Sequence, residues 1–160
     1  MGLGGELPPH SLSQRFDAAL AAGLSPTVGN FAYTLYRDER TLSRFAPEAS
    51  SASFILRQGQ AHFHPSQSWV HRPEVLQVER GQLQVDFANA RFATQLELRG
   101  PSVSSQFAAA GAIDAQGYFR ATGAGHSLAG AFATDGSQAG YFFNQAVPSG
   151  HISGLTLWGR

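Results

Sequence analysis

Three histidines in two short segments, His62-Phe-His64 and Trp69-Val-His71, are the residues best placed for metal chemistry. If residues 65–68 form the loop between two antiparallel strands, His62 lies opposite His71 and His64 lies opposite Trp69. Side chains two residues apart share one face of a strand, so the three imidazoles reach one transition-metal ion. His62, His64 and His71 are therefore the candidate ligands for a metal such as zinc, or for haem. The alternative is an exposed polar face that is rich in histidine.

A second segment, Gly125-His-Ser-Leu-Ala129, approaches the Gly-x-Ser-x-Gly nucleophile elbow of esterases but has alanine at the last position. That motif works on a sharp turn from a parallel strand into a helix, where the serine lies beside an oxyanion hole. Here the following residues have the pattern of a β-strand. No pair of acids is singled out for glycoside hydrolysis, and no glycine-rich loop precedes a helix N-terminus to hold a phosphate. We therefore expect a protein that is not an enzyme.

A connector of mixed charge runs from Arg37 to Ser51 and contains the arginines Arg37, Arg40 and Arg44. Its simplest interpretation is a solvated loop. Because loops often carry recognition residues, we take these three arginines, together with Trp69, as the candidate binding residues for a partner.

The composition narrows the class of partner. The 160 residues include 11 basic and 11 acidic side chains, and the resulting net charge of zero argues against nucleic acid or an anionic membrane surface. The absence of cysteine excludes disulfides and thiolate metal sites. No apolar run approaches the roughly 20 residues that a membrane-spanning helix needs. The 18 glycines and 12 phenylalanines favour many short strands joined by tight bends.

The strongest hairpin signal is Asp135-Gly136. A two-residue type I′ turn needs positive φ at both central positions, which Asp followed by Gly tolerates best. The cross-strand pairs that follow set small residues against large ones, as sheets bent into small barrels require. These pairs are Phe132 with Ala139, Gly130 with Tyr141, and Leu128 with Phe143.

The cleanest alternation lies between residues 82 and 96, where apolar side chains share one face and Gln82, Gln84 and Asp86 share the other. A tight turn at Asn89-Ala90 would place all the apolar residues on the inner face of a hairpin. The expected pairs are Phe87 with Phe92, Val85 with Thr94, and Leu83 with Leu96.

Elsewhere the alternation predicts further strands, and one helix is predicted at 11–22. Ser11 and Gln14 fit a capping box there, and the helix would cover the barrel or bind a partner. We expect an all-β fold, an antiparallel up-and-down β-barrel of about eight strands with one N-terminal helix. Residues 1–26 would form the extension and helix, and residues 27–160 the barrel domain. The other predicted strands are 27–37, 52–64, 68–71, 74–79, 102–111, 118–122, 127–134, 138–144 and 150–158.

Several of these segments resemble a known family. The run Gly81-Gln-Leu-Gln-Val-Asp-Phe-Ala-Asn-Ala-Arg-Phe92 is similar to a hairpin in the C-terminal barrel of bacterial FecR-domain proteins. The runs from Leu128 to Phe143 and from Ile152 to Arg160 resemble the closing strands of that barrel and of transferrin-binding-type surface lipoproteins. The matching positions are core and turn residues, so the resemblance carries over no catalytic residue.

The resemblance implies a periplasmic or cell-surface barrel that takes part in envelope signalling or iron uptake. The first hypothesis is a non-enzymatic interaction domain that acts on another envelope protein and needs no cofactor. The second is a carrier of haem, a metal or a small hydrophobic ligand, which would bind at the histidine face or in the mouth of the barrel.

Overall fold

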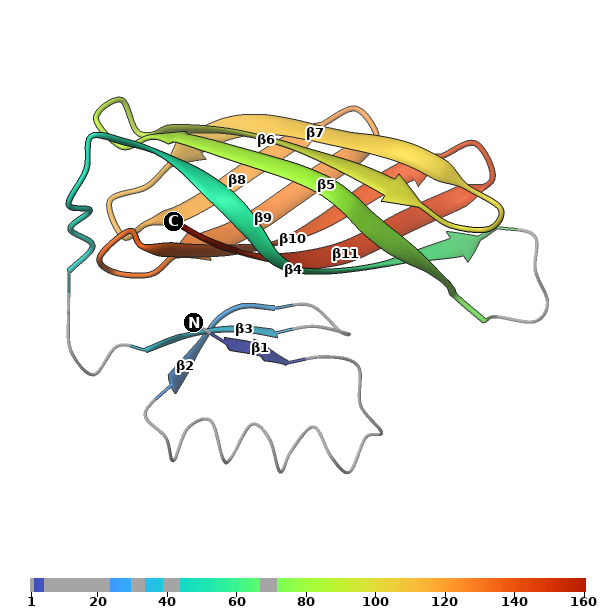
Figure 1. Ribbon diagram of the computed structural model, residues 1–160, viewed down its shortest axis with the longest axis horizontal. Helices are drawn as coiled ribbons and strands as arrows, with labels where there is room; N and C mark the ends of the chain where they lie inside the picture. The colour runs from blue at the N-terminus through green and yellow to red at the C-terminus, as the bar shows by residue number, and fades with distance from the viewer. Residues whose placement is uncertain (1, 5–23, 30–33, 39–43, 67–71) are drawn as a thin grey trace.

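The chain folds into an antiparallel β-barrel whose eight strands close on themselves (Figure 1). The structure is a computed structural model that describes the backbone of residues 2–4, 24–29 and 34–38 and the whole of residues 44–66 and 72–160. The strands follow one another around the wall in sequence order, and the last, β11, pairs with the first, β4. This confirms the predicted barrel. The strands are β4 (Ser51–Pro65), β5 (Glu74–Asp86), β6 (Arg91–Arg99), β7 (Ser104–Ile113), β8 (Tyr118–Gly123), β9 (His126–Phe132), β10 (Gln138–Val147) and β11 (Gly150–Gly159).

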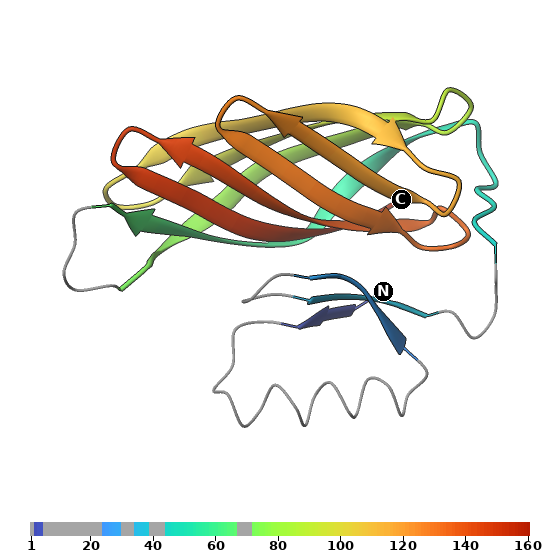
Figure 2. The same cartoon turned by 180° about the vertical axis from the view of Figure 1, so that it is seen from behind.

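A second, three-stranded sheet precedes the barrel and lies beside it (Figures 1 and 2). Its strands are β1 (Gly2–Gly4), β2 (Leu24–Gly29) and β3 (Thr34–Asp38), in the order β1-β3-β2. The sequence predicts one barrel strand over 27–37, whereas β2 and β3 pair with each other. Gly29-Asn30, inside that predicted strand, is a pair of turn-forming residues. The barrel wall therefore begins at Ser51 rather than at residue 27. The helix predicted at 11–22 lies outside the described residues.

The first barrel strand, β4, is long and bent. Leu157 of β11 pairs with Gln58 and Trp158 pairs with Leu56, so Arg57 is an extra residue on β4. Such a β-bulge bends its strand and increases the local twist, which a closed wall requires. The strand predicted over 52–64 is thus continuous and contains a bulge at Arg57.

The β9–β10 hairpin has the predicted pairing but a different turn. Phe132 pairs with Ala139, and the other two predicted pairs are also present. The turn is closed by the Gly136 N–H, which donates to the Ala133 carbonyl at 2.8 Å. Gly136 has a φ of +71°, whereas Asp135 is not among the described residues with positive φ. A type I′ turn needs positive φ at both positions, so the prediction of that turn type is wrong. Asp135 instead accepts hydrogen bonds from the Ser137 hydroxyl and N–H, which lower its pKa.

The β5–β6 hairpin has the predicted faces but a different register. Asp86 pairs with Arg91 and Val85 with Phe92, so residues 87–90 form a four-residue loop. The predicted register is therefore wrong by two residues. Because a strand has a period of two, this shift leaves the same side chains facing the lumen. Leu83, Val85, Phe92, Thr94 and Leu96 are all buried there.

Aromatic side chains fill the lumen toward both ends of the barrel. The rings of Phe107 and Phe143 lie 4.7 Å apart between their centroids toward one end. Toward the other end the rings of Phe119 and Phe132 lie 4.6 Å apart. The Phe107–Phe143 contact joins β7 to β10, which are not neighbours in the wall, so two sides of the barrel pack directly against each other there.

A chain of hydrogen bonds crosses the middle of the lumen. Trp158 Nε1–H donates to Thr156 Oγ1 at 2.7 Å, and the Thr156 hydroxyl bonds to that of Tyr141. Tyr141 Oη lies 2.7 Å from Thr94 Oγ1, and the Thr94 hydroxyl donates to the Gln82 carbonyl at 2.9 Å. In this direction each hydroxyl accepts one bond and donates one, so these buried groups are satisfied. We call this set of five residues the crossing chain.

The crossing chain joins opposite walls. Tyr141 stands on β10 and Thr94 on β6, and these two strands are four places apart in the ring of eight. A contact of 2.7 Å between them leaves no open channel at this level. Burial raises the pKa of the Tyr141 phenol well above its usual value, so this hydroxyl keeps its proton and remains a donor.

Removing the central hydroxyl tests the crossing chain. We expect Tyr141→Phe to lower the free energy of unfolding by about 1–3 kcal/mol, because Thr156 and Thr94 each lose a buried partner. Chemical denaturation measures this loss, and a double-mutant cycle with Thr94→Val gives the coupling between the two side chains. Thr122→Val, at an exposed position on β8, serves as the control and should change stability by less than about 0.5 kcal/mol. A Tyr141→Phe protein as stable as the parent would contradict the crossing chain.

A second prediction concerns the glycine that faces the aromatic core. A Cβ on Gly130 would lie 2.6 Å from the Phe119 ring and 2.6 Å from the Tyr141 Cβ. Gly130→Ala should therefore cost about 1–3 kcal/mol through overpacking, measured by thermal or chemical unfolding. Ser127→Ala, at an exposed position on the same strand, is the matched substitution and should be nearly neutral. Equal stability of the two variants would show that the core accommodates the methyl group.

Candidate functional site on the outer wall of the barrel

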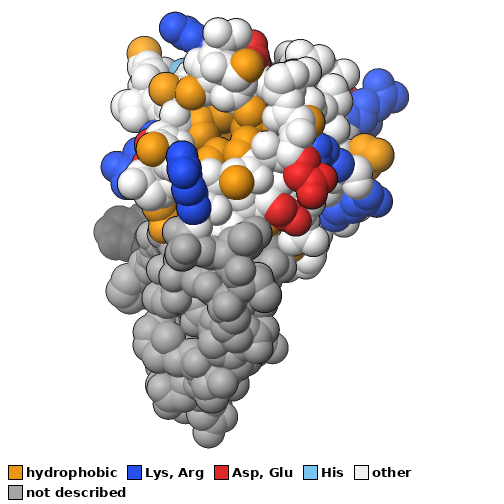
Figure 3. Space-filling view, turned by 90° about the vertical axis from the view of Figure 1, so that its left-hand side faces the viewer, with side chains coloured by type: hydrophobic (Ala, Val, Ile, Leu, Met, Phe, Trp, Pro, Cys, Tyr) orange, Lys and Arg blue, Asp and Glu red, His pale blue; other side chains and the backbone are white. Residues whose placement is uncertain are grey.

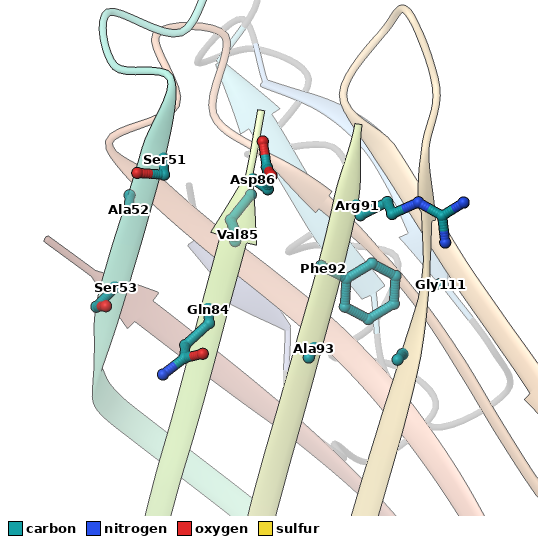
Figure 4. Close-up of a pocket in the computed structure, with 11 residues that line it drawn as sticks. Ser51, Ala52, Ser53, Gln84, Val85, Asp86, Arg91, Phe92, Ala93 and Gly111 are labelled. Carbon is teal, nitrogen blue, oxygen red and sulfur yellow. The ribbon is translucent and has the colours of Figure 1, made fainter. Parts of the chain in front are cut away.

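An open groove with a volume of about 810 Å³ crosses the outer wall over β4, β5, β6 and β7 (Figure 4). Its residues lie in cross-strand rows. One row is Ser53, Gln84, Ala93 and Ala110, which are successive Cα partners across the four strands. Only Gln84 has a long side chain in this row, so the wall is hollowed between larger neighbours.

The neighbouring row carries the charges of the groove. Ser51 pairs with Asp86, and Asp86 pairs with Arg91. The Asp86 carboxylate accepts bonds from the Asn89 side chain at 2.8 Å and the Asn89 backbone N–H at 2.9 Å. These bonds hold the pKa of Asp86 below its ordinary value, so the carboxylate is charged at neutral pH. The groove thus offers a guanidinium, a carboxylate and an amide beside small apolar side chains.

A second surface, which we call the covered wall, lies on the outer side of β9, β10 and β11. Ala131, Phe142 and Leu155 point away from the lumen, because each alternates with inward-facing neighbours. Their exposed fractions are nevertheless 0%, 6% and 0%. Strand β2 of the small sheet lies against β9. The wall therefore already holds a segment of its own chain through an apolar face.

These two surfaces lie on opposite sides of the molecule. In the ring of eight strands, β5 stands opposite β9 and β6 stands opposite β10. The groove over β4–β7 is thus directed away from the small sheet and open to solvent.

One end of the barrel, at the left of Figure 1, is apolar at its centre (Figure 3). Phe45 lies over this end and packs against Phe87 and Phe132, with ring centroids 5.9 and 6.0 Å apart. The Ala46 N–H donates to the Thr134 carbonyl at 2.8 Å and holds the segment in place. This part of the connector therefore closes the barrel end rather than forming a free loop.

The histidine face is rearranged relative to the sequence prediction. His62 and His64 share the outer face of β4, as predicted, but His62 lies opposite Val75 on β5. The pairing assumed for a three-histidine site is therefore wrong, and His71 lies outside the described residues. The histidine that adjoins His64 is His151 of β11, with parallel rings whose centroids are 4.5 Å apart. Residues 44–66 and 72–160 contain no cluster of three or more potential metal ligands.

The structure describes few of the predicted binding residues. Arg44 is exposed where the connector approaches the barrel. Arg37 lies in β3 opposite Ser25, and its side chain is not described. Arg40 and Trp69 lie outside the described residues.

The sequence prediction missed the groove. One signal for it is present in the sequence: small residues such as Ser53 and Ala93 occupy outward positions on strands whose other outward side chains are mostly longer.

The segment that resembles an esterase elbow lies within the barrel wall. Ser127 sits inside β9, where it pairs with Asn144 on one side and Thr122 on the other. It is followed by the rest of the strand rather than by a helix. The strand-turn-helix geometry of a nucleophile elbow is therefore not formed at this serine.

Two comparisons with known proteins give no assignment. No protein-family model matches this sequence. No curated protein matches it either. In the described part of the chain, no helix has the length and apolar character needed to cross a bilayer. Function must therefore be argued from the surfaces of the barrel.

A charge placed on the covered wall tests whether the small sheet depends on it. We expect Ala131→Glu to separate β2 from β9, because a buried carboxylate without a partner is strongly unfavourable. Hydrogen exchange of the amides of residues 24–29 should accelerate by about tenfold or more. Ala110→Glu, at an exposed outward alanine on β7, is the matched control and should leave this exchange unchanged. Unchanged exchange in both variants would show that β2 is held independently of the wall.

Proposed function

We propose that this protein is a non-enzymatic interaction domain that binds another protein of the bacterial cell envelope through its outer wall. In this proposal it belongs to the periplasm or the cell surface and takes part in FecR-like envelope signalling or iron uptake.

The observation that carries this proposal is the filled lumen. The crossing chain spans the full width of the barrel, with 2.7 Å between Tyr141 and Thr94. Ligand-carrying barrels need an open interior, whereas small barrels with packed interiors leave only their outside and their loops for recognition. The filled lumen therefore favours a protein partner over a small ligand held inside.

The resemblance to FecR-domain barrels supports the cellular context. Its three matching runs fall on β5–β6, on β9–β10 and on β11, which are adjacent or closing elements of one barrel. The periplasmic or surface location and the link to iron uptake rest on this resemblance.

The groove is the surface that we assign to the partner. It is open, and it faces away from the small sheet. Arg91 is exposed at its edge and would pair with an acidic side chain. Gln84 offers a donor and an acceptor to a polar backbone, and Ala93 and Ala110 leave room for close approach. A protein segment that carries an acidic residue fits this combination.

Site-specific crosslinking in the native cells tests the proposal. A photoreactive amino acid at Ala93 should yield a discrete adduct with one envelope protein, identified by mass spectrometry. The same group at Thr122, an exposed outward position on β8, should yield none. Arg91→Glu should reduce the Ala93 adduct by about tenfold, because it places like charges together.

Three outcomes would contradict the proposal. Crosslinks of equal yield at Ala93 and Thr122 would mean non-specific contact. An absence of any adduct at Ala93 would remove the groove as a docking surface. Recovery of the chain and its adduct only from the cytoplasmic fraction would exclude the envelope context.

A further inference from the structure

The pairing of β4 with β11 is the seam that closes the barrel, because it joins the first and last strands of the wall. His64 and His151 are Cα partners across this seam. Both side chains point outward, because the adjacent residues Phe63 and Ile152 are buried in the lumen. Two imidazoles are thus brought together by the closure of the barrel itself.

The two rings are close and aligned. Their centroids lie 4.5 Å apart and their planes are within 7° of parallel. The Nε2 atom of His64 lies 3.1 Å from the Ser153 hydroxyl, which also belongs to β11. When Nε2 donates to that oxygen, Nδ1 of the same ring carries the lone pair. The torsion between Cβ and the ring is broad, so each ring can turn about this bond and direct one nitrogen toward a shared ion.

We propose that His64 and His151 bind one divalent ion of the first transition row across the seam. Imidazole nitrogen suits Zn²⁺, Ni²⁺ and Cu²⁺, whereas Mg²⁺ and Ca²⁺ prefer oxygen ligands. Among the described residues, these two imidazoles are the ligands that we assign to the ion. The site holds the seam shut, and it is independent of the protein partner proposed for the groove.

Because the pair lies across the seam, an ion bound to it should stabilise the folded barrel. His64 and the β11 residue that it contacts, Ser153, are separated by 89 positions in sequence. Because only the closed barrel brings the two rings together, an ion that binds both of them stabilises the folded state by mass action. Metal binding should therefore appear as a rise in the melting temperature.

The test uses the full chain with Ni²⁺ or Zn²⁺ as the probe, against a sample in chelator. We expect the ion to raise the melting temperature by about 3 °C or more, with one ion bound per chain by calorimetry. His64→Gln and His151→Gln should each remove most of this rise. The double variant should lose no more than either single one, because one ion needs both rings. All variants should melt in chelator near the parent temperature, since both side chains lie on the outer face.

His126→Gln, at a histidine on β9 away from the seam, is the matched control and should keep the full rise. Four results would overturn the proposal. One is a rise that survives in either seam variant. Another is losses that add between the two variants, which would indicate separate sites. The third is an equal loss in the His126 variant, and the fourth is no rise in the parent protein.

Discussion

The hydrogen bonds that cross the lumen are the constraint on which this barrel depends. A barrel of eight strands encloses just enough space for side chains, and here the large rings of Tyr141 and Trp158 occupy its middle. Their polar atoms would be costly if unpaired, so the threonines at 94 and 156 must lie where they do. The crossing chain of hydrogen bonds runs from β11 through β10 to β6. It therefore fixes the distance between opposite walls of the barrel as well as their register.

The hairpins show how far the sequence could predict this fold. The β9–β10 register was predictable because Gly130 has no side chain and a large residue must fill the space beside it. Tyr141, its partner on β10, fills that space. The β5–β6 register was not, because alternation fixes only which face a residue occupies, and a shift of two residues preserves that face. The crossing chain was beyond prediction, since it depends on which strands stand opposite each other in the closed ring.

The surface sites were harder to predict for the same reason. A search for partners of His64 along the sequence leads to residues 69–71, whereas its neighbour across the seam is His151. The groove likewise arises from a row of residues on four strands, of which only adjacent pairs are hairpin partners. Local sequence patterns do not show which residues form such a row, because the row depends on the register between strands, and β-bulges shift that register.

The closed barrel separates stability from recognition. Inward positions are committed to packing and to the crossing chain, so a substitution there changes the fold before it changes any contact with a partner. Outward positions are of two kinds. Ala131, Phe142 and Leu155 on β9–β11 are apolar and buried on the side of the small sheet, whereas the residues that line the groove over β4–β7 include small and polar side chains that are open to solvent. The groove is more polar than the covered wall, which suits the dissociable protein partner that we propose for it.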